Sequence, residues 1–235
     1  GTVRTLQLLW HASAAGVVHG RGDRGRGLGL SDQTATAIYG LYTAAVFLSS
    51  LPGGWIADRL MGARHAVWIG GIIIMCGHFI LAIPNDSIFF LGLIVIVLGT
   101  GLLKPNITAI VGELYELDDP RRDSGFTLFY MGINLGAALG PLACGWLALR
   151  NWHYGFAAAG VGMFFGLIQF RLTRHYLGEA GRAPDPSAGG GDYFRRRAWS
   201  AIGLFVTLIG CLLVAGPSGW LHYDAIRLAE SATYA

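Results

Sequence analysis

Long apolar runs separated by short polar stretches are the main pattern along this chain. A helix that spans a membrane needs about 20 mostly apolar residues. Several runs approach that length and are apolar all round rather than along one face, which argues against amphipathic surface helices. The predicted spans are residues 34–56, 66–83, 88–112, 125–149, 154–171 and 198–216. The polar sequence "PNDS" at 84–87 is a turn signal, so the second and third spans should form a helical hairpin.

The composition supports a membrane protein. Apolar residues make up 53% of the 235 residues and charged residues only 13%, whereas a soluble domain carries about 25% charged residues. The fold class is therefore predicted to be all-α and integral to the membrane. Cys76, Cys144 and Cys211 lie in apolar segments at no metal-ligand spacing, and they are interpreted as small core residues. The spans hold no evident nucleophile, metal cluster or paired carboxylates, so neither an enzyme nor a cofactor is predicted.

The arginines indicate the orientation of the spans. They follow the first, third and fifth spans, whereas Arg150 is the only one in the intervening loops. Because cytoplasmic loops carry an excess of basic residues, the basic loops are predicted to be cytoplasmic. Residues 176–197 are predicted to be a basic, Gly-rich cytoplasmic linker, and its Gly-, Pro- and Ala-rich stretch 178–192 is predicted to be flexible.

Lys104 is the only lysine in the chain, and it lies inside an apolar run beside Pro105. A charged side chain at the centre of a spanning helix costs about 2.5–3.5 kcal/mol on insertion scales, so such a residue is a functional candidate by default. Lysine can lose its proton when it is desolvated, which arginine effectively cannot. A site that binds an anion and responds to protons would favour lysine. A structural ion pair inside the bundle is the alternative, although no acidic residue on the spans is an obvious partner.

Two features of the span at 125–149 predict contacts with other groups inside the membrane. Gly132, Gly136 and Gly140 recur every four residues and line one helix face, which predicts close packing against another helix. Asn134 carries an amide that needs a partner within the membrane. That partner is either a neighbouring helix or a substrate, and the spacing favours neither.

Three stretches together resemble the proton-dependent oligopeptide transporter family of the major facilitator superfamily. They are "GGWIADRLMGARHAV", "GTGLLKPNITAIVGELY" and "RRDSGFTLFYMGINLGAALGPL", and the resemblance covers about residues 30–175. It implies proton-coupled import of di- and tripeptides by alternating access, through a central site between two six-helix halves. The spans then correspond to helices two to six of the N-terminal bundle. The span at 198–216 corresponds to a helix that many bacterial members insert between the halves.

The resemblance also implies roles for individual residues. Lys104 would bind the peptide carboxylate and take part in proton coupling, and Asn134 would face the peptide. A family tyrosine falls on Phe47, so its hydroxyl contact is absent here. Tyr39 completes the predicted substrate-binding set. In this superfamily a charged cytoplasmic loop latches helix ends and is released during transport, although the same loop could simply be a positively charged anchor. The predicted gating residues are Gly54, Asp58, Arg59, Gly62, Arg64, Arg122 and Asp123.

The first helix of the family carries a Glu-x-x-Glu-Arg-Phe motif followed by Tyr-Tyr-Gly, which residues 1–27 lack. Reading one base out of frame permits Glu-Arg-Phe and then Tyr-Tyr-Gly between Arg4 and Ala12. Residues 1–27 are therefore predicted to be a frameshifted translation of that helix, with a divergent amphipathic leader as the alternative. Residues 28–175 would form the transporter bundle, and 198–235 the inserted helix and tail. Without the second half of the protein, the chain is expected to be a fragment that cannot transport alone.

The predicted partners are small peptides, protons and the lipid bilayer, with no nucleic acid. The predicted location is the bacterial inner membrane, as a multi-pass protein. Two alternatives remain open. One is transport of another anion, such as nitrate or a carboxylated metabolite, because a lysine in the pocket does not exclude it. The other is a structural subunit, which would not need Lys104.

Overall fold

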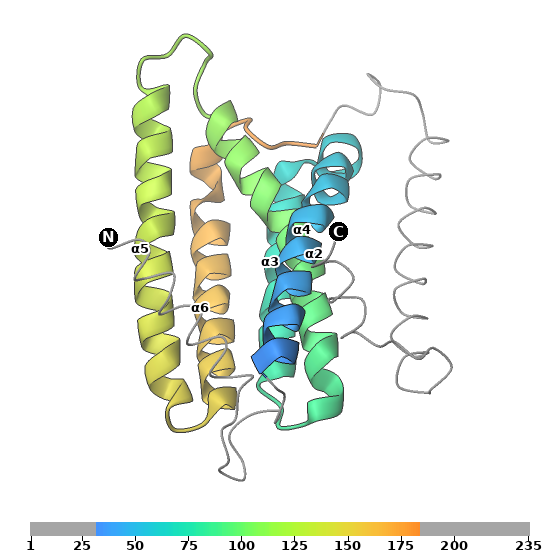
Figure 1. Cartoon of the computed structure of the whole chain (residues 1–235). Coiled ribbons are helices and arrows are strands. Elements are labelled where there is room, and N and C mark those ends of the chain that lie inside the picture. Colours follow the sequence, from blue (N-terminus) through green and yellow to red (C-terminus); the bar gives the residue numbers. More distant parts are fainter. Residues whose placement is uncertain (1–31, 184–235) are drawn as a thin grey trace.

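The computed structural model describes residues 32–183, which form an all-helical bundle (Figure 1). Five long helices run up and down through it: α2 (Asp32–Ile56), α3 (Ala63–Leu81), α4 (Asp86–Glu113), α5 (Arg122–Ala148) and α6 (Trp152–Thr173). A π-helical turn, η1 (Ala57–Met61), joins α2 to α3, and a 3₁₀ turn, η2 (Arg174–Leu177), follows α6. The predicted all-α class is thus confirmed.

The helix boundaries agree with the predicted spans to within a few residues, and the hairpin turn between α3 and α4 is present. Four helices of the described part, α3 to α6, are long and apolar enough to cross a membrane. The fifth, α2, is diluted by serines, threonines and glycines and contains Pro52. The predicted frameshifted segment, 1–27, and the predicted inserted helix, 198–216, lie outside the described residues.

Helix α4 is the centre of the bundle, because it packs along α3 on one side and along α2 on another. Helix α6 lies against α3, and α5 lies mainly against α6. Two clusters of buried apolar side chains form the core. One contains Leu81, Phe89 and Ile96, and the other contains Ala63, Val67, Ile110 and Ala180.

Glycines allow α2, α3 and α4 to approach closely. A Cβ added to Gly70 would lie 2.7 Å from the Gly99 carbonyl oxygen, and one added to Gly53 would lie 2.0 Å from the Gly101 oxygen. Any larger residue would push these helices apart, so the glycines permit backbone-to-backbone contact.

The predicted packing role of Gly132, Gly136 and Gly140 is not fulfilled between the described helices. A Cβ at each of them would meet no atom within 4 Å. Helix α5 instead meets α6 farther along, where Gly155 lies under the Cys144 carbonyl oxygen, 2.9 Å from the position of an added Cβ. The regularly spaced glycines therefore lie on an open face of α5, and the close contact of α5 with α6 in the described chain is made elsewhere on the helix.

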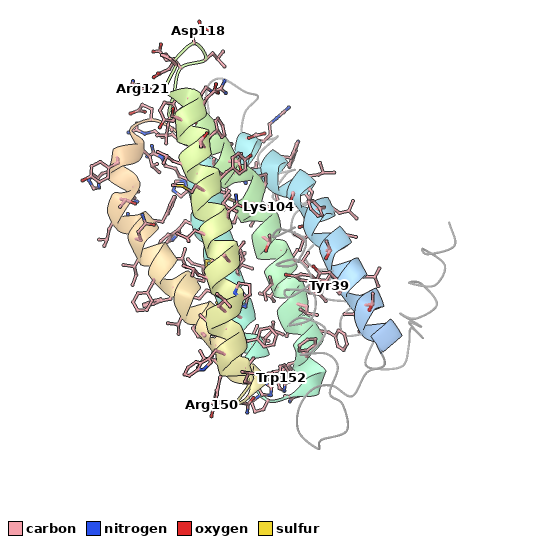
Figure 2. The ribbon with its side chains drawn as sticks, turned by 60° about the vertical axis from the view of Figure 1, so that its left-hand side comes forward. Tyr39, Lys104, Asp118, Arg121, Arg150 and Trp152 are labelled. Carbon is pink, nitrogen blue, oxygen red and sulfur yellow. The ribbon has the colours of Figure 1, made fainter. Side chains whose placement is uncertain are left out.

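Because consecutive helices alternate in direction, the carboxyl ends of α2, α4 and α6 share one end of the bundle. Arg121 lies at this end and Arg150 at the opposite one (Figure 2). We call the end with Arg121 the basic end. This arrangement places the predicted basic loops together, as the orientation prediction requires.

Candidate functional site

Lys104 lies part-way along α4 with its side chain exposed on the described bundle (Figure 2). Its Nζ is 4.5 Å from the ring centroid of Phe47 on α2, within the range of a cation–π interaction. The Phe47 side chain is itself 61% exposed. Within residues 32–183 the ammonium group has no ion-pair partner. The described helices therefore contain no structural ion pair of the kind considered as the alternative for Lys104.

The close approach of α2 and α4 brings Phe47 to Lys104. The Ser49 hydroxyl on α2 donates a hydrogen bond to the Val97 carbonyl on α4, at 3.1 Å. Pro105 has no N–H, so the carbonyl one turn earlier, that of Gly101, lacks its usual helical partner. That carbonyl lies directly against Gly53 of α2. Helix α4 continues through Pro105 to Glu113. The proline therefore does not end the helix, and it leaves the Gly101 carbonyl at the contact with α2.

Asn106 holds the same two helices together, and the sequence did not identify it. Its side chain is 1% exposed. The amide nitrogen donates hydrogen bonds to the carbonyls of Gly53, at 3.2 Å, and Leu102, at 2.6 Å. Since buried polar groups in folded proteins are nearly always hydrogen-bonded, an asparagine in an apolar run is a usable signal for such a link. Asn106 is two residues from Lys104, so this hydrogen bond also fixes the backbone of α4 near Lys104 relative to α2.

The other two predicted substrate-binding residues are more distant from this contact. Asn134 is exposed on α5, and its side-chain amide makes no hydrogen bond to another described residue. Helix α5 has few contacts with α4. Tyr39 is half-buried on α2 and lies farther from the basic end than Lys104 (Figure 2). The structure thus joins Lys104 to Phe47 and leaves Asn134 and Tyr39 as predictions.

The charged loop after α2 divides into two parts. Gly62 has φ 77°, which confirms that a glycine is needed to leave the π-helical turn. Asp58 and Arg59 are exposed, and Asp58 forms no ion pair with another described residue. Arg64 is half-buried and donates side-chain hydrogen bonds to the carbonyls of Gly178 and Ala180. Gly54 has more room, because the nearest atom to an added Cβ is 3.9 Å away.

Arg122 and Asp123, predicted to act with this loop, begin α5. The guanidinium carbon of Arg122 is 5.8 Å from the Phe126 ring centroid, and its buried Nε has no partner within the described chain. Asp123 is exposed. Nearby, Arg121 forms an ion pair with Asp119 at 2.9 Å, and its hydrogen bonds hold the pKa of that carboxyl below its usual value. Within the described residues, the side chains of Arg64 and Arg122 therefore contact different parts of the bundle.

Residues 178–182, the first part of the predicted linker that follows η2, are bonded to the bundle. They carry the carbonyls that bind Arg64, and Ala180 is buried in the core. Their glycines, Gly178 and Gly181, have positive φ angles of 55° and 70° and form tight turns, and the predicted flexibility of the linker stays a prediction. Residues 184–197 of the predicted linker lie outside the described part of the chain.

Comparison with known proteins points to one family. The profile of the POT family matches residues 64–189. An uncharacterised transporter of Bacillus subtilis (strain 168) is 53% identical over 164 residues, which is 68% of this chain and 33% of that protein. A di-/tripeptide transporter of Lactobacillus helveticus is 43% identical over 188 residues, which is 75% of this chain and 38% of that protein.

Solved structures agree. The crystal structure of a peptide transporter POT in complex with sulfate has a TM-score of 0.79 at 41% identity, covering 94% of this chain and 46% of that one. A POT family transporter in complex with 5-aminolevulinic acid has a TM-score of 0.78 at 34% identity, covering 95% of this chain and 49% of that one. The chain thus spans about half the length of these structures and 33–38% of the two curated relatives.

Proposed function

The chain belongs to the POT family of multi-pass membrane transporters, and from that premise we propose that the protein containing it imports di- and tripeptides together with protons. Support comes from the similar di-/tripeptide transporter of Lactobacillus helveticus and from the similar solved peptide transporter. Transport would proceed by alternating access around a site near the membrane midplane, as in other secondary transporters. Because the relatives are bacterial, we assign the protein to the bacterial cytoplasmic membrane.

Lys104 is the residue on which this proposal rests. Its ammonium group would attract the carboxylate of the peptide. The supporting observation is that this charge is exposed beside Phe47 and has no ion-pair partner in the described bundle. Lys104 precedes the end of α4 by nine residues, about 14 Å at 1.5 Å per residue. That depth is close to half of a hydrocarbon core of about 30 Å.

The neighbouring residues would complete recognition. Phe47 has no hydroxyl, so we assign it a face for the Lys104 cation and for an apolar part of the peptide, instead of a hydrogen bond. Asn134 has an exposed amide that could donate to and accept from a peptide backbone. Tyr39 would contribute from the same helix as Phe47. Lys104 would also exchange the coupled proton, since lysine, unlike arginine, can be deprotonated when desolvated.

The loop residues would control opening at the basic end. Asp58 and Arg59 are exposed on the turn between α2 and α3, and Arg122 and Asp123 lie at the start of α5. Charges in these places can pair with groups on approaching helices and separate again at small cost, because exposed ion pairs contribute about 0–1 kcal/mol each.

A second candidate is the transport of another small carboxylated compound. The observation that favours it is the similar POT family transporter solved with 5-aminolevulinic acid. An ammonium group attracts any carboxylate, so Lys104 alone does not select a peptide. Residues that contact the peptide backbone would make that selection, and Asn134 is the described residue we assign to it.

Uptake into proteoliposomes tests the proposal. The complete gene product that contains this sequence would be reconstituted, and labelled dialanine uptake would be measured with an inward proton gradient. We expect Lys104→Gln to abolish gradient-driven uptake, and Arg150→Gln, at the opposite end, to leave it unchanged. Full uptake by Lys104→Gln would refute the role of Lys104. Uptake of 5-aminolevulinic acid without any dipeptide uptake would favour the second candidate.

A further inference from the structure

The chain after α6 turns across the basic end of the bundle towards α3 and α4 (orange in Figure 1). Residues 178–182 of this turn, which we call the clasp, bind both of these helices. The Gly181 N–H donates to the Glu113 carboxylate at the end of α4, with a distance of 2.6 Å. The Gly181 carbonyl accepts from the Arg64 N–H at the start of α3, at 2.9 Å. A single residue of the clasp therefore connects the end of one helix with the beginning of another.

The Arg64 side chain adds two further bonds. Its Nε donates to the Ala180 carbonyl and its Nη2 to the Gly178 carbonyl. The planar guanidinium presents donors in a fixed fork, so it can bind two backbone carbonyls at once. Lysine has a flexible stem and a single ammonium, and would not reproduce this arrangement. Through its main chain and its side chain together, Arg64 contacts three residues of the clasp.

Packing also requires the clasp to follow this path. Ala180 is buried in the cluster with Ala63, Val67 and Ile110. Gly181 has φ 70°, and a Cβ there would lie 2.8 Å from a side-chain carbon of Ile110. Gly62, with φ 77°, would place a Cβ 2.5 Å from the Ala183 nitrogen. At the contact between the clasp and the start of α3, each of the two segments therefore has a glycine: Gly181 in the clasp and Gly62 before α3.

We propose that the clasp is a permanent fastening that keeps α3, α4 and α6 together as one rigid body at the basic end, with Arg64 and Glu113 as its positioning residues. Separation would break four hydrogen bonds and expose Ala180. Asp58, in the same loop, is exposed and forms no ion pair within the described residues. The charged loop is thus divided in function: Gly62 and Arg64 hold the clasp, and Asp58 takes part in opening. The proposal goes beyond peptide transport and does not depend on the substrate.

Distances between spin labels test the fastening directly. His65→Cys and Arg182→Cys would carry labels in the complete gene product, which would be placed in lipid nanodiscs at several pH values, with and without dialanine. Both positions are exposed, so the labels have room. We expect one short distance under every condition. A second, longer distance that grows with dialanine or pH would overturn the proposal, whether or not the protein transports peptides.

Variants test whether the hydrogen bonds of Arg64 and Glu113, rather than the overall stability of the protein, keep the clasp in place. Arg64→Lys and Glu113→Ala each remove hydrogen bonds of the clasp, so each should raise the population of a longer distance by about tenfold. Glu113→Gln keeps an acceptor oxygen and should have a smaller effect. Gly166→Ala is the matched control for Gly181→Ala, because an added Cβ at Gly166 meets nothing within 4 Å. If Gly181→Ala does not fold, the Arg64 and Glu113 variants still decide, and an unchanged short distance in both would contradict the assignment of these residues.

Discussion

The α3–α4 pair and α5 are both rich in glycine, yet they are used in opposite ways. In α3 and α4 the glycines face the neighbouring backbone, so that an added Cβ at Gly70 or Gly99 would lie 2.7 Å from a carbonyl oxygen. In α5, Gly132 and Gly136 are exposed and no residue of the helix is fully buried. The two asparagines follow the same division, since Asn106 is buried and bonded and Asn134 is exposed.

This difference separates a scaffold from a working surface. Close backbone contact fixes α2, α3 and α4 relative to each other, and it leaves no room for a substrate between them. The exposed side of α5 has room for a substrate, but it makes no close backbone contacts with another described helix. Lys104 belongs to both regions, because its backbone is in the packed helix and its side chain is exposed beside Phe47. A rigid backbone that presents an exposed charge is suited to binding a ligand from outside the scaffold.

The largest contrast should come from adding one methyl group to each region. Gly53→Ala would place a Cβ 2.0 Å from the Gly101 oxygen, so we expect a loss of about 3 kcal/mol in unfolding free energy. Gly136→Ala meets no atom of the described chain and should change stability by about 1 kcal/mol or less, in the stabilising direction. Thermal unfolding in detergent, followed by tryptophan fluorescence, measures both. Equal losses in the two variants would remove the distinction between scaffold and surface.

The asparagine pair offers a second contrast. Asn106→Ala leaves the Gly53 carbonyl without its side-chain donor and removes a buried amide, which should cost about 1–3 kcal/mol. Asn134→Ala should leave the unfolding temperature unchanged and weaken dipeptide uptake instead. Asn106→Ala should therefore have its main effect on stability, and Asn134→Ala on uptake. A large loss of stability in Asn134→Ala would place this residue in the scaffold.

Phe47 tests how the exposed lysine is held. A cation–π contact contributes about 0.5–2 kcal/mol, which corresponds to a change of about 2-fold to 30-fold in an affinity. Phe47→Leu keeps an apolar side chain without a ring, so the KM for dialanine should rise within that range, while Vmax changes less. Phe47→Tyr keeps the ring face and should retain the low KM. Equal KM values in the leucine and tyrosine variants would show that the ring face is not used.

The smallest effect is expected at the exposed Asp119–Arg121 pair in the loop before α5. Hydrogen bonds from Arg121 lower the pKa of Asp119 in the folded protein. The pair therefore contributes stability above the ordinary aspartate pKa, and this contribution is lost as the pH falls through the lowered value. Asp119→Asn should reduce the unfolding temperature slightly at neutral pH and not at all below the folded pKa. A difference that persists in acid would have to come from something other than the charge.

Much of this fold could be predicted from the sequence, because the apolar runs determine which segments become helices and the arginines mark their ends. The links between helices could not. Asn106 bonds to a carbonyl 53 residues away, and Arg64 to one 116 residues away, and no local pattern specifies such partners. The composition around Gly178 and Gly181 predicts a linker, and no local pattern predicts that residue 181 bonds to both α3 and α4. Lys104 can be identified from the sequence because a charged side chain inside an apolar membrane span is costly, whichever residues surround it in the fold.

The central claim is that Lys104 recognises the carboxylate of the substrate. The most direct test compares the affinity of a dipeptide with that of its C-terminal amide, in the unaltered protein and in Lys104→Gln. We expect the unaltered protein to prefer the free carboxylate by about tenfold or more, as a charge-assisted hydrogen bond provides, and the variant to bind both forms equally. A preference of the same size in both proteins would contradict the claim.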